Sequence, residues 1–167
     1  VEIARNQGRH VGLMKAAEDE VMGINSPEDL VEANALFQKK TRLKFLQKGV
    51  LMRDPNSVWF SYDTKIGSNV TIGPNVYFGE NTKISNDVII HPFCHMEGAD
   101  VGKGASIGPF SRLRPKTKIA ANVQIGSFVE LKNAKIEKGA KIPHLSYIVD
   151  AVVGSNSNIG AVTITCN

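Results

Sequence analysis

The strongest constraint on the fold is an aliphatic residue that returns every six positions along most of the chain. This period matches neither the 3.6-residue turn of an α-helix nor the two-residue alternation of an amphipathic strand. It is typical of a parallel β-helix, in which three hexapeptides form one triangular coil and the aliphatic side chains point inward. The residues of this inward series are Ile66, Ile72, Phe78, Ile84, Ile90, Val101, Ile107, Leu113, Ile119, Ile125, Leu131, Ile136, Ile142, Ile148, Val153 and Ile159.

A second series of mostly small residues follows many of the inward positions four residues later. Glycine often comes directly after the aliphatic residue, as in IGSNV, IGPNV and IGSF, and small residues let the chain turn at each corner. We expect about five to six coils spaced ~4.8 Å apart. The fold class is mainly β, and six-residue periods favour the left-handed β-helix, an exception to the right-handed crossover rule. The second series is Val70, Val76, Thr82, Val88, Cys94, Ala105, Ser111, Thr117 and Val123.

Residues 1–25 predict a small mixed α/β segment. A helix should end near Gly8, and a short strand should follow around His10–Met14. The chain begins at Val1 without an initiator Met, inside this expected helix, so we expect a cut end rather than a natural start.

Residues 26–56 predict a connecting helix and a linker. Ser26 suits the N-cap, Pro27 the first helical position, and Asp29 the acidic position of a capping box. Gly49 should close the helix. Residues 57–167 then form the β-helix domain.

The composition narrows the class of protein. Its 42% hydrophobic and 22% charged residues are ordinary for a globular chain. No apolar run approaches the ~18 residues that cross a bilayer, and the N-terminus is no signal peptide, so we expect no membrane and a cytoplasmic location. Cys94 and Cys166 have neither metal nor disulfide spacing. The net charge of +4 is scattered, which argues against nucleic acid and for a phosphorylated small molecule.

Three polar clusters interrupt the repeat: 112–115, 128–132 and 144–147. Arg114 and Lys132 are 18 residues apart, one full coil, so they should stack as an anion site or as a solvated face. His144 is either a structural residue or a general base, and a nearby Glu130 could orient it. His91 and His95 raise a zinc alternative, but their spacing does not match that of known β-helix zinc enzymes.

The strings IGPFSRLRP (107–115), GSFVELK (126–132), HLSYIVDA (144–151) and NIGAVTITCN (158–167) carry a resemblance. They resemble the bifunctional bacterial N-acetylglucosamine-1-phosphate uridylyltransferase / glucosamine-1-phosphate acetyltransferase family, in order and over essentially the whole chain. In that family a nucleotidyltransferase domain is joined by a helix to a left-handed β-helix that trimerises. The resemblance implies that residues 1–25 end the first domain and that 57–167 begin the second.

The resemblance also implies roles for single residues. His144 would be the acetyltransferase base, which takes a proton from the 2-amino group of glucosamine 1-phosphate as the amine attacks acetyl-CoA. Glu130 lies in the same active-site motif. The remaining roles are sugar-phosphate binding by Arg114, Lys132, Tyr147 and Asn158, acetyl-CoA contacts by Ala161 and Asn167, and metal and nucleotide binding by Asn25.

For the parent protein the resemblance implies two steps of UDP-N-acetylglucosamine synthesis in a cytoplasmic homotrimer. Acetyl-CoA is the co-substrate of the first step, and the second transfers uridylyl from UTP to N-acetylglucosamine 1-phosphate with Mg²⁺. The sequence lacks the Gly-rich nucleotide loop and stops at Asn167, so we expect this segment to be inactive alone. Val149 and Val162 stand where the family usually has Gly.

Two alternatives stay open. The chain could belong to another hexapeptide acyltransferase, such as an O-acyltransferase of a nucleotide sugar. It could also be a non-catalytic trimeric scaffold, because hexapeptides alone indicate stacked coils and no chemistry.

Overall fold

The computed structural model describes residues 1–165, apart from the side chain of Asp19. The chain divides into two compact units, Val1–Lys39 and the residues from Lys40 onward. Within the described residues, no helix combines the length and the apolar character that a membrane span requires.

The first unit contains helices and no strand. Helix α1 spans Glu2–Asn6, a short 3-10 helix spans Glu18–Glu20, and helix α2 runs over Pro27–Gln47 into the second unit. The strand expected around His10–Met14 is wrong, since residues 9–17 have no regular secondary structure. A strand must pair its backbone groups with a neighbouring strand, and the first paired strand in the described chain begins at Leu51.

The predicted capping box at the start of α2 is present. The Ser26 hydroxyl accepts a hydrogen bond from the Asp29 N–H at 3.1 Å, and the Asp29 carboxylate accepts one from the Ser26 N–H at 3.0 Å. The same carboxylate also accepts from the Asn25 N–H at 2.8 Å. At the other end, Gly49 has φ +82° and follows the last helical turn, as expected for a glycine after a helix.

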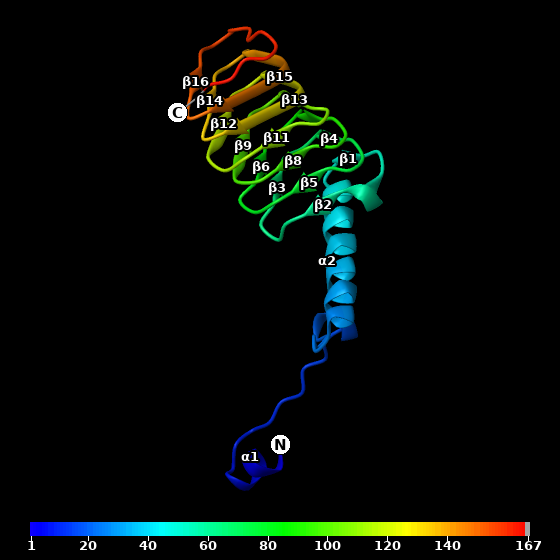
Figure 1. Cartoon of the computed structure of the whole chain (residues 1–167). Coiled ribbons are helices and arrows are strands. Elements are labelled where there is room, and N and C mark those ends of the chain that lie inside the picture. Colours follow the sequence, from blue (N-terminus) through cyan, green and yellow to red (C-terminus); the bar gives the residue numbers. More distant parts are fainter. Residues whose placement is uncertain (166–167) are drawn as a thin grey trace. The chain divides into compact units, whose positions relative to one another are not determined.

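The second unit is a parallel β-helix with three faces, visible in Figure 1 as rows of stacked strands. The first face contains β1 (Leu51–Met52), β4 (Thr71–Ile72), β7 (Ile89–Ile90) and β10 (Ser106–Ile107). The second contains β2 (Trp59–Phe60), β5 (Tyr77–Phe78), β8 (His95–Met96) and β11 (Arg112–Leu113). The third contains β3 (Lys65–Ile66), β6 (Lys83–Ile84), β9 (Ala99–Val101), β12 (Thr117–Ile119), β14 (Lys135–Ile136) and β16 (Val152–Val153).

Two longer strands connect the first face to the second. Strands β13 (Gln124–Lys132) and β15 (Lys141–Val149) begin on the first face, pass the corner and end on the second. They pair with each other in parallel, with Ser127 opposite His144 and Glu130 opposite Tyr147. The segments that carry the candidate site are therefore neighbours in one ladder.

The inward series forms the core, as predicted. Ile72, Phe78, Ile107 and Leu113 are fully buried, and the second series of small residues is buried beside them. Several core residues were absent from the predicted series. Among them Met96, which is fully buried, fills the inward position between Ile90 and Val101. The left-handed parallel β-helix expected from the repeat is thus confirmed.

The corners of the prism place residues at positive φ, a region that favours Gly, Asn and Asp. The corner between the third and first faces follows this rule with Asn69, Asp87, Gly104, Asn122, Gly139 and Asn156. The corner between the first and second faces has Asn75 at its first positive-φ position, but its later positions do not carry Gly, Asn or Asp. Its next residues, called the apolar corner below, are Phe93, Phe110, Phe128, Leu145 and Val162, with φ between +43° and +64°.

The neighbours Ile89 and Ile90 allow a direct test of the inward register. Ile90 is 1% exposed and points into the core, whereas Ile89 is 47% exposed on the outer surface of the same strand. Ile90→Ala should lower the free energy of unfolding by about 2–5 kcal/mol, because it leaves a cavity between stacked coils. Ile89→Ala is the matched control and should cost under about 1 kcal/mol. Urea titration followed by circular dichroism measures both, and equal losses would contradict the register.

The cap of α2 predicts a pH dependence. The pKa of Asp29 lies below its ordinary value of 3.8, mainly because the Asn25 N–H donates to the carboxylate, with the backbone and side chain of Ser26 adding to the effect. Since the folded pKa is depressed, the stabilisation is present above the unfolded pKa and is lost as the pH falls through the folded value. Carboxyl chemical shifts should give a pKa below 3.8 that rises in Ser26→Ala. A pKa at or above 3.8 in the unaltered chain would contradict the capping geometry.

Candidate functional site

A column of large polar and aromatic side chains runs along the outside of the second face. In-register pairing stacks Trp59, Tyr77, His95, Arg112, Glu130 and Tyr147 in successive coils. The rings of Tyr77 and His95 stack at 4.7 Å between centroids. Burial lowers the pKa of His95 from its ordinary value of 6.5, and the adjacent Arg112 charge lowers it further. The C-terminal part of this column, from Arg112 to Tyr147, contains predicted site residues.

Glu130 is the centre of a small ionic cluster in the C-terminal part of this column. Its carboxylate accepts a hydrogen bond from the Arg114 guanidinium at 2.9 Å and lies 3.8 Å from the Arg112 guanidinium. The same Arg114 nitrogen lies 3.5 Å from the Tyr147 hydroxyl. Charge-assisted bonds of this kind hold a guanidinium in a defined orientation. Arg114 is therefore oriented by Glu130 and lies beside Tyr147.

Arg114 and Lys132 occupy equivalent places in successive coils, as predicted, because Leu113 pairs with Leu131 in the ladder. Lys132 in turn lies opposite Val149. Arg112 and Arg114 both lie against the single carboxylate of Glu130, and Lys132 follows two residues later in the same strand, so this part of the surface has an excess of positive charge. Such a surface can bind a phosphate group.

A hollow of about 400 Å³ lies next to this cluster. Glu130 and Tyr147 line it from the second face, and three members of the apolar corner line it from the side. It thus combines an apolar wall with a hydroxyl and a carboxylate, the usual composition of a small-molecule site. The complete lining is Phe128, Glu130, Leu145, Ser146, Tyr147, Val162 and Ile164.

His144 lies at the end of the first face, directly before Leu145 of the apolar corner. Its side chain is exposed, and Ser127 lies opposite it in the neighbouring coil. A Cβ at Gly126 would collide with the carbonyl group of Pro143, so Gly126 permits the close approach of the coil that carries His144. Within residues 1–165, no hydrogen bond joins His144 to Glu130, whose carboxylate is bound to Arg114 instead. The expected orientation of His144 by Glu130 therefore has no contact to support it.

The remaining predicted residues lie in different places. Asn158 pairs with Lys141 on the first face, and Ala161 lies in the last coil, directly before Val162. Asn167 is outside the described residues. Asn25 donates its backbone N–H to Asp29 beside α2.

The zinc alternative has no support in the described chain. His91 lies after β7 on the first face and contacts the Ser106 hydroxyl at 3.1 Å, whereas His95 lies in β8 on the second face. Among residues 1–165 there is no group of three His, Cys, Asp or Glu side chains that could hold a metal ion.

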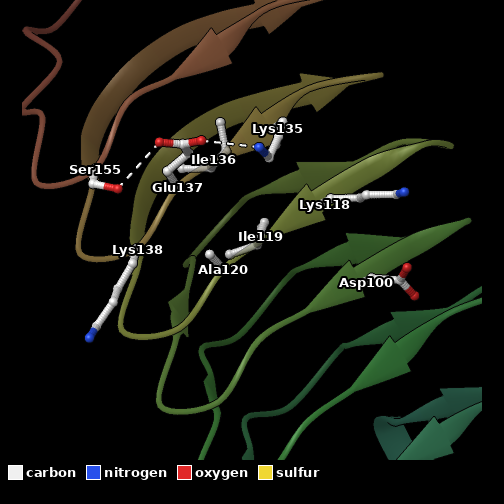
Figure 2. Close-up of a pocket in the computed structure, with 9 residues that line it drawn as sticks. All are labelled: Asp100, Lys118, Ile119, Ala120, Lys135, Ile136, Glu137, Lys138 and Ser155. Atoms are coloured by element: carbon white, nitrogen blue, oxygen red, sulfur yellow. Dashed lines mark hydrogen bonds and ion pairs between the residues drawn. The ribbon is translucent and has the colours of Figure 1, made fainter.

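A second hollow, of about 440 Å³, lies on the third face (Figure 2). Its charged lining residues are Asp100, Lys118, Lys135, Glu137 and Lys138. Among them Glu137 is held by Lys135 at 3.0 Å, and it also accepts from the Ser155 hydroxyl at 3.3 Å. None of the predicted site residues lines it. The cluster around Glu130 is therefore the better candidate for the functional site.

Sequence reasoning missed two contributions to the site. The 112–115 cluster includes Arg112, to which the sequence analysis assigns no role, yet its register places it opposite Glu130. The signal for this pairing is the 18-residue offset between the two residues. The apolar wall was also missed, although Phe110, Phe128 and Leu145 recur at intervals of one coil.

Two protein-family models match this chain. Residues 63–98 match the family described as "Bacterial transferase hexapeptide (six repeats)", and residues 100–167 match "GMPPB C-terminal domain". Over all 167 residues the chain is 49% identical to the bifunctional protein GlmU of Zymomonas mobilis and 56% identical to that of Brucella anthropi. PerB from Caulobacter crescentus, solved with CoA and GDP-perosamine, is 20% identical, with a TM-score of 0.37 over 80% of this chain and 60% of that one.

The fold and its repeat define a left-handed hexapeptide β-helix of the bacterial transferase class. Along its whole length the chain belongs to the family of the bifunctional GlmU proteins. It spans 37% of the length of these curated relatives.

Proposed function

We propose that the β-helix belongs to an acetyltransferase that moves the acetyl group of acetyl-CoA to the 2-amino group of glucosamine 1-phosphate. The observation that carries this proposal is the cluster of Arg114, Glu130 and Tyr147 from three successive coils. Lys132 belongs to the strand of Glu130, and His144 to the strand of Tyr147. Arg114 and Lys132 would bind the phosphate group, and Tyr147 and Asn158 would bind the sugar. Ala161 and Asn167 would contact acetyl-CoA.

The proposed step follows from the chemistry of the two reactants. The amine nitrogen attacks the thioester carbonyl, the new N–C bond forms, and the C–S bond breaks to release the CoA thiolate. The attacking ammonium must first lose a proton, and His144 is the proposed base that accepts it. Glu130 contributes by holding Arg114 in position, the one role that its observed contacts support.

A second activity, uridylyl transfer from UTP to N-acetylglucosamine 1-phosphate with Mg²⁺, is proposed for the whole protein because its relatives are named bifunctional. Asn25 is its one candidate ligand in this chain, and the described residues contain no metal-binding group of three side chains. Asn25 alone therefore does not fit a complete magnesium site. Together the two steps would supply UDP-N-acetylglucosamine in the cytoplasm.

The apolar corner supports a proposed homotrimer. Its side chains are 47–71% exposed, and the rings of Phe93, Phe110 and Phe128 stack at 4.9 and 5.2 Å. Large apolar residues at positive φ are strained, and a contiguous exposed apolar ridge is typical of a protein interface. A second copy of this chain would cover the ridge and close the hollow beside Tyr147 from outside.

The base assignment is tested with the full-length protein. His144→Ala should reduce kcat for acetylation of glucosamine 1-phosphate by about 10²–10⁴-fold, because the ammonium then lacks its base. His91→Ala removes an imidazole from the same face and should keep nearly full activity. Turnover within a few-fold of the unaltered protein in His144→Ala would refute the assignment.

The same assay separates the alternatives. Acetylation of a nucleotide-sugar hydroxyl in place of the amine would favour an O-acyltransferase, and no acyl transfer to any sugar would favour a scaffold. A hydroxyl acceptor and an amine acceptor differ in the proton that the base must remove.

The interface assignment is tested by light scattering. Asn tolerates positive φ, so replacing both Phe110 and Phe128 by Asn should preserve the corner while it removes the apolar ridge. The trimer of this double variant should dissociate at micromolar concentration. Lys116→Asn, at φ +68° on another corner, is the matched control and should stay trimeric. A trimeric mass for the double variant would contradict an interface on this ridge.

A further inference from the structure

Glu130 places a negative charge beside the proposed phosphate ligands. Those ligands, Arg114 and Lys132, occupy equivalent places in adjacent coils, two residues after the opposed pair of Arg112 and Glu130. The Glu130 carboxylate reaches diagonally across these four side chains and accepts a hydrogen bond from Arg114 at 2.9 Å. A phosphate bound between Arg114 and Lys132 would therefore lie close to a carboxylate, and two negative charges at such a distance repel each other.

Arg114 can bind an anion while it stays bound to Glu130. A guanidinium has five N–H donors in a planar fork. The side-chain contacts of Arg114 to Glu130 and to Tyr147 are both made by the same Nη1 nitrogen, so its other nitrogens can donate to a phosphate. Lys132 has no ion-pair partner within residues 1–165, and its ammonium group can bind the same anion. The carboxylate thus orients Arg114 usefully, but its charge opposes the ligand.

Arg112 lies where it can offset that charge. Strand pairing puts it directly opposite Glu130, and its guanidinium lies 3.8 Å from the same carboxylate oxygen that Arg114 binds. On its other side Arg112 pairs with His95. The pKa of His95 lies below 6.5, mainly because of burial and further because of the Arg112 charge, so the neutral imidazole is favoured. Within residues 1–165, Glu130 is therefore the one ionic partner of Arg112.

We infer that Arg112 is a positioning residue that neutralises Glu130, so that this carboxylate can orient Arg114 without repelling the phosphate of glucosamine 1-phosphate. The inference rests on the proposed acetyltransferase function. Arg112 acts through Glu130 and needs no contact with the substrate, whereas Arg114 and Lys132 bind the phosphate directly. The loss of Arg112 should consequently matter only while residue 130 carries a negative charge.

The first experiment titrates glucosamine 1-phosphate into the full-length protein and its variants by calorimetry. Arg112→Gln should raise the Kd about tenfold, because the Glu130 charge then acts on the phosphate unopposed. Arg112→Met is a second uncharged variant with the same expected result, and Arg112→Lys should restore most of the affinity. Lys118→Gln removes a cation from the third face and should leave the Kd unchanged. Circular dichroism checks that each variant is folded.

A double-mutant cycle with Glu130→Gln separates this role from direct attraction of the phosphate. Gln keeps the shape of Glu but removes its charge, so adding Arg112→Gln to Glu130→Gln should change the Kd by less than about twofold. The acetylation assay gives a second readout. Arg112→Gln should raise KM for the sugar phosphate while kcat stays within a few-fold, because the repulsion acts on substrate binding and not on the transfer step.

The outcomes are distinguishable. A loss of about tenfold in both backgrounds would overturn the inference, since Arg112 would then attract the phosphate directly. An unchanged Kd in Arg112→Gln would also overturn it, and the proposed function stands if the unaltered protein acetylates the amine. If the unaltered protein neither binds glucosamine 1-phosphate nor acetylates it, the proposed function and the inference fail together.

Discussion

In-register hydrogen bonding between successive coils is the interaction on which the rest of the structure depends. The N–H of Trp59 donates to the carbonyl of Val76 at 2.9 Å, that of Tyr77 to Cys94 at 2.9 Å, and that of His95 to Ser111 at 3.0 Å. Because each coil repeats the path of the one before, equivalent side chains stack at the strand spacing of ~4.8 Å. Residues 17 or 18 positions apart thereby become neighbours, and the site is built from such neighbours.

The irregular steps in the repeat leave this arrangement intact at the candidate site. The five-residue steps from Met96 to Val101, from Leu131 to Ile136 and from Ile148 to Val153 all lie between the second and third faces. The corner between the first and second faces has no such step. Strands β13 and β15 therefore pass it together, with Ser127 through Lys132 in continuous register with His144 through Val149. Stacking also places the like charges of Arg114 and Lys132 in successive coils, and such neighbours destabilise a sheet. The Glu130 carboxylate, which binds Arg114, offsets that repulsion.

Register and local geometry could be predicted from the sequence, whereas side-chain direction and distant contacts could not. The inward residues and the stacked Arg114–Lys132 pair are consequences of the period, and the Ser26–Asp29 box is a consequence of a spacing of three. Met96 lies six residues after Ile90, so the same period could have predicted it. The contact between Glu130 and Arg114 depends on which way the carboxylate points, and a periodicity carries no such information.

The apolar corner is the place where these constraints meet. Positive φ is required at every corner, and Asn, Asp or Gly meets that requirement with little strain. At this corner the chain instead uses Phe93, Phe110, Phe128, Leu145 and Val162. Because their side chains are exposed, they gain little burial in a single chain to offset the strain, so the corner is better explained by the molecules that contact it from outside. The proposed neighbouring copy would bury the phenylalanine stack of this corner and so offset the strain.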